Sequence, residues 1–230
     1  YKSISVKNLT TQFKNYPQAR SSIKKYGIIK AYGVNTYQGL IRNYNEDRVS
    51  IMLNLSKPAD FVGKWPRCSI FSIYDGHGGN KCADYLRDYF FDFIIKDSNF
   101  PSNPEQALKN AFIKAEKNFI DKIAVDTNGN LCDTSGSCVV LALFVNDVCY
   151  IANLGDSRAV LSKSKCEYVT ALTTDHKPDN IVESSRIINN GGIIYKATKN
   201  NEIGPTRVNP GKLSVNIINP GIPYYRRYTR

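Results

Sequence analysis

Apolar and polar residues follow one another along the chain in segments that predict both strands and helices. The clearest is an apolar run within Ser69–Tyr74, which predicts a buried strand of ordinary length. The run stops at Asp75-Gly76-His77-Gly78-Gly79, and an apolar stripe at three- and four-residue steps then predicts a helix from Lys81 to about Ile95. Taken alone, Asp-Gly is a common turn. A carboxylate and an imidazole at a strand-to-helix corner, beside three glycines, also suit a place where the backbone approaches a ligand.

The rest of the chain contains patterns that predict two more helices and several further strands. A second helix is predicted from Pro104 to about Ile123, and a third from about Asn180 to Asn190, after which prolines and glycines predict loops. Further strands are predicted over Ile28–Thr36, Val49–Leu55, Cys138–Val145, Val148–Asn153, Ala159–Leu161 and Tyr168–Leu172. Hairpins beside clustered helices predict an α+β fold in which helices cover antiparallel sheets. We divide the chain into an N-terminal extension (1–27), one domain (28–215) and a tail (216–230).

Basic residues gather at the two ends of the chain. Lys and Arg outnumber Asp and Glu by 31 to 20, which gives a formal net charge of +11. Residues 1–30 hold seven Lys or Arg and no acid, and residues 181–230 hold eight and two, whereas residues 31–180 hold sixteen against eighteen. Because the centre is slightly acidic and has no stripe of basic and aromatic residues, we expect no nucleic-acid partner.

The cysteines and the hydropathy bear on the compartment. The six cysteines form no C-x-x-C pair, so free thiols in a reducing compartment are expected, and the protein is expected to be intracellular, cytoplasmic or nuclear. No apolar run reaches the ~18–20 residues that a transmembrane helix needs. The first residue is Tyr, so an N-terminal lipid anchor stays an open alternative.

Acidic residues recur where the predicted strands end. They form the groups Glu46-Asp47, Asp75-Gly76-His77, Gly155-Asp156 and Asp175-His176. Carboxylates of this kind favour Mg²⁺ or Mn²⁺, which activate water and hold phosphate. Arg42 could bind a phosphate through its guanidinium, and His77 could donate a proton to a leaving oxygen. The residues alone therefore predict metal-assisted hydrolysis of a phosphate ester.

Ordinary structural interpretations compete at several of these positions. Arg42 could simply pair with Glu46 on the surface. His176, followed by Lys-Pro, is interpreted as a structural turn residue before a helix. Asp156 could belong to a hairpin corner or to a metal site, and Cys138 is interpreted as core packing.

Six segments in order resemble one family. They are QGLIRNYNED (38–47), FSIYDGHGG (71–79), SGSC (135–138), ANLGDSRAVL (152–161), TTDHKP (173–178) and RVNPGKLSV (207–215). Together they resemble the metal-dependent Ser/Thr protein phosphatases of type 2C, the PPM family. The resemblance implies a sandwich of two antiparallel β-sheets flanked by helices, with residues 28–215 as the catalytic domain, and we expect this sandwich to be incomplete at the C-terminus. It also implies hydrolysis of phosphoserine or phosphothreonine in phosphorylated protein substrates by a metal-activated water.

The resemblance also implies roles for individual residues. Arg42 matches the phosphate-binding arginine, and His77 matches the proposed general acid. Asp75 matches the aspartate that bridges two Mn²⁺ or Mg²⁺ ions. The other implied metal-site residues are Glu46, Asp47, the carbonyl of Gly76 and Asp156.

The match stops at Val215. The family has two further metal-binding aspartates, one in an Asp-Gly-x-Trp-Asp stretch and one in an Asp-Asn pair, and no matching stretch follows Val215 here. The one Asp-Asn pair, Asp179-Asn180, is interpreted as a helix N-cap. We therefore expect one of the two metal sites to be incomplete. The alternative function is a catalytically impaired pseudophosphatase that binds phosphoproteins or acts as a regulatory module.

Overall fold

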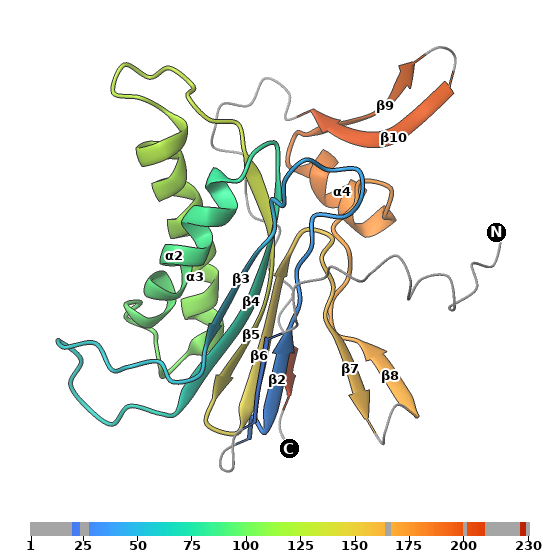
Figure 1. Cartoon of the computed structure of the whole chain (residues 1–230). Helices are drawn as coiled ribbons and strands as arrows, with labels where there is room; N and C mark the ends of the chain where they lie inside the picture. The colour runs from blue at the N-terminus through green and yellow to red at the C-terminus, as the bar shows by residue number, and fades with distance from the viewer. Residues whose placement is uncertain (1–19, 24–27, 164–166, 200–201, 210–225, 229–230) are drawn as a thin grey trace. The chain divides into compact units, whose positions relative to one another are not determined.

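The computed structural model describes residues 20–23, 28–163, 167–199, 202–209 and 226–228 (Figure 1). The chain forms two compact units, Tyr1–Asn45 and Glu46–Arg230. In the first, the short strands β1 (Arg20–Ile23) and β2 (Ala31–Val34) form an antiparallel pair. Part of the region predicted as an extension is thus a strand, whereas the proposed domain limits stay a prediction.

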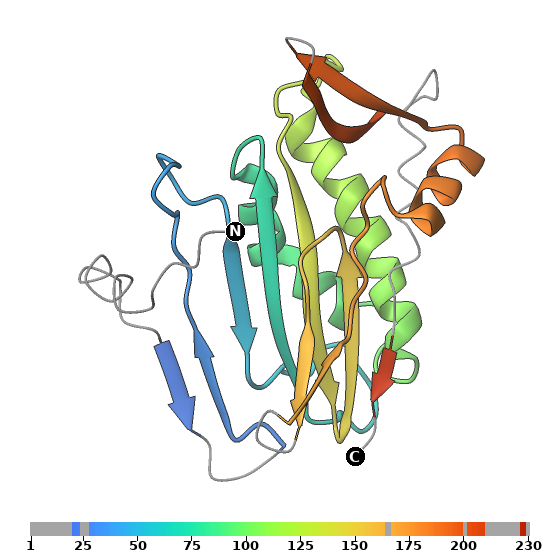
Figure 2. The same ribbon diagram turned by 90° about the vertical axis from the view of Figure 1, so that its right-hand side faces the viewer.

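The second unit is built on an antiparallel sheet of five strands in the order β11-β6-β5-β4-β3 (Figure 2). The strands are β3 (Arg48–Met52), β4 (Cys68–His77), β5 (Gly136–Val145), β6 (Val148–Leu154) and β11 (Arg226–Tyr228). Asn146 has a φ of 52° in the tight turn between β5 and β6, which confirms the predicted hairpin. The two longest strands, β4 and β5, lie side by side at the centre.

Two helices, α2 (Lys81–Ile95) and α3 (Pro104–Phe119), cover one face of this sheet (Figure 1). A short π-helix, η1 (Ile120–Ala124), continues α3. Alternate residues of the strands point to the helices because strand side chains alternate between faces. The buried core that results includes Ile70, Tyr74, Leu141, Leu143, Phe90, Leu108 and Phe112. Asp75, His77 and Cys138 alternate with the core residues of β4 and β5 and lie where β4 ends and β5 begins.

The remaining elements of this unit are two hairpins and one helix. Strands β7 (Val160–Lys163) and β8 (Tyr168–Ala171) form one pair, and β9 (Ile193–Lys199) and β10 (Glu202–Asn209) form another. Between them lies α4 (Ile181–Asn189). The prediction of loops after the third helix is therefore wrong for residues 193–199 and 202–209, and its continuation over residues 210–225 lies outside the described residues. Its glycine and proline signals, Gly204 and Pro205, fall where the register of β10 shifts, a position at which a strand tolerates proline.

Most other elements agree with the sequence prediction. The α+β class with antiparallel sheets and outer helices is confirmed, and α2 has the predicted bounds. Asn180 caps α4 by accepting hydrogen bonds from the backbone N–H groups of Val182 and Glu183, as predicted for a helix N-cap. One boundary is wrong: β4 does not stop before Asp75 but continues through His77.

Two further predictions from the sequence concern free cysteines and membrane-spanning helices. Cys68, Cys82, Cys132, Cys138 and Cys149 are free, which confirms the expectation for these five, while Cys166 lies outside the described residues. In the part of the chain that the structure describes, no helix combines the length and the apolar character that crossing a bilayer requires.

A buried carboxylate ties the end of α2 to α3. Asp97 is 3% exposed and accepts hydrogen bonds from Lys114 Nζ at 2.7 Å and from the side chains of Asn99 and Asn110. Burial by itself raises the pKa of Asp97, but the hydrogen bonds from Lys114, Asn99 and Asn110 more than offset it, so the pKa is well below its usual range.

The lowered pKa of Asp97 predicts an acid-dependent loss of stability. A group with a lowered folded-state pKa contributes stability above its unfolded pKa of about 3.9, and this is lost as the pH falls further. We expect Asp97→Asn to lower the thermal midpoint at about pH 7 and the difference from wild type to shrink by about pH 3. Asp121→Asn, at an exposed position on η1, is the matched control. A difference that stays constant with pH would contradict the assignment.

Candidate metal centre

Polar side chains meet where β3, β4 and β5 lie side by side. Asp75 on β4 lies directly opposite Cys138 on β5. On the other side of β4, Arg48 of β3 pairs with Tyr74. Because the two strands are antiparallel, Asp47, the residue before Arg48, lies level with Asp75. Burial raises the pKa of Asp47, and the nearby carboxylates of Asp75 and Glu46 raise it further, although Arg48 opposes them. Negative charge is therefore concentrated around Asp75.

Asp156 joins this group from the turn after β6. The Sγ–H of Cys138 donates to Asp156 Oδ1 at 3.5 Å, and the Ser157 hydroxyl donates to Asp75 Oδ2 at 3.2 Å. One ligand atom from each of Asp75, Cys138 and Asp156 lies within 4.8 Å of the other two. The ammonium of Lys177 lies 3.4 Å from Asp156 Oδ2. We call Asp75, Cys138 and Asp156 the strand-end cluster.

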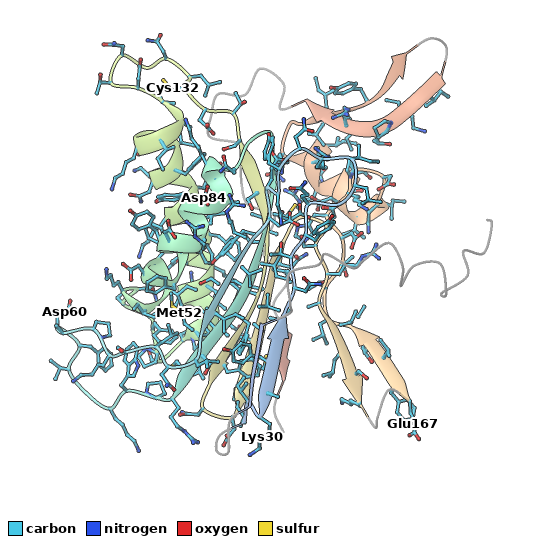
Figure 3. The ribbon with its side chains drawn as sticks, in the orientation of Figure 1. Lys30, Met52, Asp60, Asp84, Cys132 and Glu167 are labelled. Atoms are coloured by element: carbon cyan, nitrogen blue, oxygen red, sulfur yellow. The ribbon has the colours of Figure 1, made fainter. Side chains whose placement is uncertain are left out.

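The backbone before β3 is held close to the cluster. A Cβ on Gly76 would clash with the backbone carbonyl oxygen of Glu46, so only glycine permits this approach. The N–H of Gly79 donates to Glu46 Oε1 at 2.7 Å. Arg48 fixes the same segment to α2, where Nε donates to Asp84 Oδ1 at 2.7 Å; Asp84 is labelled in Figure 3. The carboxylate of Glu46 thus supports the loop after β4.

His77 ends β4 next to the cluster and is exposed. It lies opposite Gly136, and a Cβ at that glycine would be 2.5 Å from His77 Nε2, so the imidazole lies over bare backbone. Both His77 and Cys138 line a groove of about 500 Å³ whose other walls come from α2, α3 and α4. The imidazole can therefore be reached by a ligand and could exchange a proton with it.

His176 and Asp175 are structural. The N–H of Gly155 donates to His176 Nδ1 at 3.2 Å, and the N–H of His176 donates to the Gly155 carbonyl at 3.0 Å. Burial lowers the pKa of His176, which suits a neutral acceptor. Asp175 forms a two-pronged ion pair with Arg158, at 2.6 and 2.7 Å. The interpretation of His176 as a turn residue agrees with these contacts.

The structure brings several of the predicted site residues together within the second unit. Asp75 and Asp156 share the strand-end cluster, and Asp47 lies beside Asp75. Arg42 belongs to the other compact unit, so its predicted role stays a prediction.

Cys138 was not predicted as a site residue. Its interpretation as core packing is wrong, since its sulphur is half-buried and faces two carboxylates. The pairing of Asp75 with Cys138 across β4 and β5 is what identifies Cys138. The sequence indicates this pairing only if β4 is extended as far as Asp75.

The cluster fits a divalent cation. Two carboxylates supply oxygen donors of the kind that Mn²⁺ and Mg²⁺ prefer, and the thiol adds a softer donor. The positive charge of Lys177 beside Asp156 already offsets part of the negative charge there.

Comparison with known proteins identifies the family. The family model described as "Protein phosphatase 2C" matches residues 32–209. The chain belongs to the protein phosphatase 2C family. Two solved structures show the same fold. A Caenorhabditis elegans sex determining protein has a TM-score of 0.60 and 20% identity, over 82% of this chain and 46% of that one. The serine-threonine phosphatase 2C from Toxoplasma gondii has a TM-score of 0.54 and 19% identity, over 82% of this chain and 70% of that one.

Curated members of the protein phosphatase 2C family are more similar in sequence. "Probable protein phosphatase 2C 7" from Oryza sativa subsp. japonica is 37% identical over 126 residues, which are 55% of this chain and 32% of the rice protein. "Probable protein phosphatase 2C 2" from Paramecium tetraurelia is 34% identical over 149 residues, which are 60% of this chain and 48% of its own length. The chain thus spans less than half the length of these curated relatives.

Proposed function

We propose that this protein hydrolyses phosphoserine and phosphothreonine in phosphorylated proteins, in a reaction assisted by Mn²⁺ or Mg²⁺. The observation that carries the proposal is the strand-end cluster: two aspartates from the segments Asp75-Gly76-His77 and Gly155-Asp156 come within 4.8 Å in a chain of the protein phosphatase 2C family. Membership of this family favours a phosphatase over other hydrolases.

Asp75 and Asp156 would hold the cation, with Asp47, Glu46 and the carbonyl of Gly76 completing its surroundings. A bound divalent cation supplies a more acidic water and neutralises charge on the phosphate. The Ser157 hydroxyl keeps one oxygen of Asp75 in place through its hydrogen bond at 3.2 Å. The ion pair between Arg48 and Asp84 holds the Glu46-Asp47 segment against α2.

Two residues would act on the substrate itself. His77 is exposed at the end of β4, where its imidazole would give a proton to the departing serine or threonine oxygen. Arg42 would bind the phosphate by a charge-assisted, two-pronged hydrogen bond. We also expect the protein to act in the cytoplasm or nucleus, because the five cysteines that the structure describes are unpaired.

Hydrolysis of a phosphothreonine peptide by the purified chain tests the proposal. We expect phosphate release that requires millimolar-scale Mn²⁺ and disappears with EDTA, because the cluster needs its cation. Circular dichroism first establishes that the chain is folded. Turnover that survives EDTA would contradict metal assistance. If the folded chain binds the phosphopeptide but releases no phosphate with Mn²⁺, the phosphatase proposal fails for these 230 residues and the pseudophosphatase alternative replaces it.

A further inference from the structure

Helix α2 begins without a capping side chain of its own. Asn80 precedes the helix, but its side chain makes no capping hydrogen bond and donates to Asp84 Oδ2 at 2.9 Å instead. In the first turn, the backbone N–H of Cys82 donates to Ser135 Oγ at 3.0 Å. Because the first N–H groups of a helix have no partner inside it, this oxygen takes the place of an N-cap. The cap comes from the segment before β5, so it joins two distant parts of the chain.

Asp133 orients the hydroxyl group of Ser135. The hydroxyl donates to Asp133 Oδ1, and the same oxygen accepts the N–H of Ser135 at 2.9 Å. The Ser135 hydroxyl and the ammonium of Lys81, which is 3.3 Å from Asp133 Oδ2, hold the pKa of Asp133 below its usual range, although burial opposes them. An ionised carboxylate can only accept hydrogen bonds, so the serine proton points to Asp133 and the serine oxygen is left to accept from Cys82.

The same serine lies beside the segment that carries His77. The residue after Ser135 is Gly136, which pairs with His77 and leaves its backbone bare under the imidazole. On the other side, Gly79 has a φ of +129°, and a Cβ there would lie 3.2 Å from the Cβ of Ser135. Glycine therefore lets the loop after His77 lie against the serine. His77 is held between two anchors, the β4–β5 pairing before it and the Ser135–Cys82 hydrogen bond after it.

We propose that Ser135 and Asp133 are positioning residues that hold the imidazole of His77 over the start of β5. The inference rests on the proposed role of His77 as proton donor and adds two residues that act through it. A proton donor must lie within hydrogen-bond reach of the leaving oxygen, and a small displacement costs much of the rate. None of the hydrogen bonds that carry the proposal involves the strand-end cluster, so their loss would move His77 and leave the cation ligands in place.

Two substrates that differ in their leaving group test the inference. The serine or threonine oxygen of a phosphopeptide needs a proton as it departs, whereas p-nitrophenolate leaves p-nitrophenyl phosphate without one. With Mn²⁺, we expect Ser135→Ala to lower kcat on a phosphothreonine peptide about tenfold and to change KM less than about twofold, because the proton is transferred only in the transition state. On p-nitrophenyl phosphate, kcat should change less than about twofold.

Matched variants separate positioning from a general loss of structure. Ser69→Ala removes a serine hydrogen bond to the Leu53 carbonyl at the other end of β4, and it should leave kcat on both substrates unchanged. Asp133→Ala should reproduce the selective loss, which tests the same contacts even if Ser135→Ala does not fold. Asp133→Asn keeps an oxygen acceptor for the serine and should retain most of the activity. Equal losses on the two substrates, or no loss on the phosphopeptide, would overturn the inference.

Nuclear magnetic resonance reads the position of His77 without turnover. The chain has two histidines, His77 and His176, so its imidazoles give two sets of signals, which His77→Gln assigns. Ser135→Ala should shift the signals of His77 and leave those of His176 in place. If the folded wild-type chain releases no phosphate, the phosphatase proposal alone fails and this comparison decides the inference. Signals of His77 that are identical in wild type and Ser135→Ala would then overturn it.

Discussion

Asp75→Asn is expected to lower kcat/KM on a phosphothreonine peptide by roughly 100-fold or more. Changing residues around the ligands of a metal typically costs about 10–100-fold in metal affinity or activity, and Asp75 would contact the metal itself. Asp75 lies opposite Cys138, at the level of Asp47 and within 4.8 Å of the nearest Asp156 oxygen. An amide in its place removes one negative charge and keeps the shape of the side chain. The loss should therefore be in cation affinity and turnover, with little change in the fold.

Two measurements establish that the loss comes from the site. Mn²⁺ binding, followed by calorimetry, should weaken in Asp75→Asn in parallel with activity, while the thermal midpoint without metal should hold or rise because carboxylate repulsion with Asp47 is relieved. Asp60→Asn, at an exposed loop position labelled in Figure 3, is the matched control and should leave both values unchanged. Wild-type turnover in Asp75→Asn would disprove a cation site at this aspartate.

Phe90→Ala is expected to lower the free energy of unfolding by about 3–5 kcal/mol, the usual cost of removing a buried phenylalanine ring. Phe90 on α2 is 1% exposed and lies between the rings of Tyr74 on β4 and Phe112 on α3, at centroid distances of 6.2 and 4.9 Å. The ring therefore joins both helices to the sheet, and its removal leaves a cavity at the centre of the core. A loss of this size is a large fraction of the stability of an ordinary domain.

Urea unfolding measures this effect with a natural probe. The single tryptophan, Trp65, packs against the same core, so its fluorescence reports the unfolding of the unit that contains Phe90. The neighbouring residue on α2 provides the control: Tyr89 is 53% exposed, and Tyr89→Ala should cost less than about 1 kcal/mol. Equal losses in the two variants would show that Phe90 does not hold the layers together.

Most elements of the fold and much of the candidate site follow from local patterns in the sequence. The stripe along Lys81–Ile95 predicts α2 because an amphipathic helix must bury one face, and the apolar runs at β5 and β6 predict the central hairpin in the same way. Six segments in order resemble the type 2C phosphatases, and the family model that matches residues 32–209 confirms this resemblance. The hairpin of β9 and β10 was missed because local proline and glycine signals predict a loop, while pairing with another strand is a long-range effect.

The family resemblance implies that Asp75 and Asp156 belong to one metal site, but the folded chain is needed to show that Cys138 lies beside them. Asp75, Cys138 and Asp156 are far apart in the sequence, and no local pattern indicates that they lie within 4.8 Å. Their meeting depends on strand register, and moving β4 by one residue would turn Asp75 to the opposite face. The same register brought in Cys138, which the sequence presents as one more apolar strand residue. Composition and periodicity determine which faces are buried, but pairing between distant strands determines which polar groups meet.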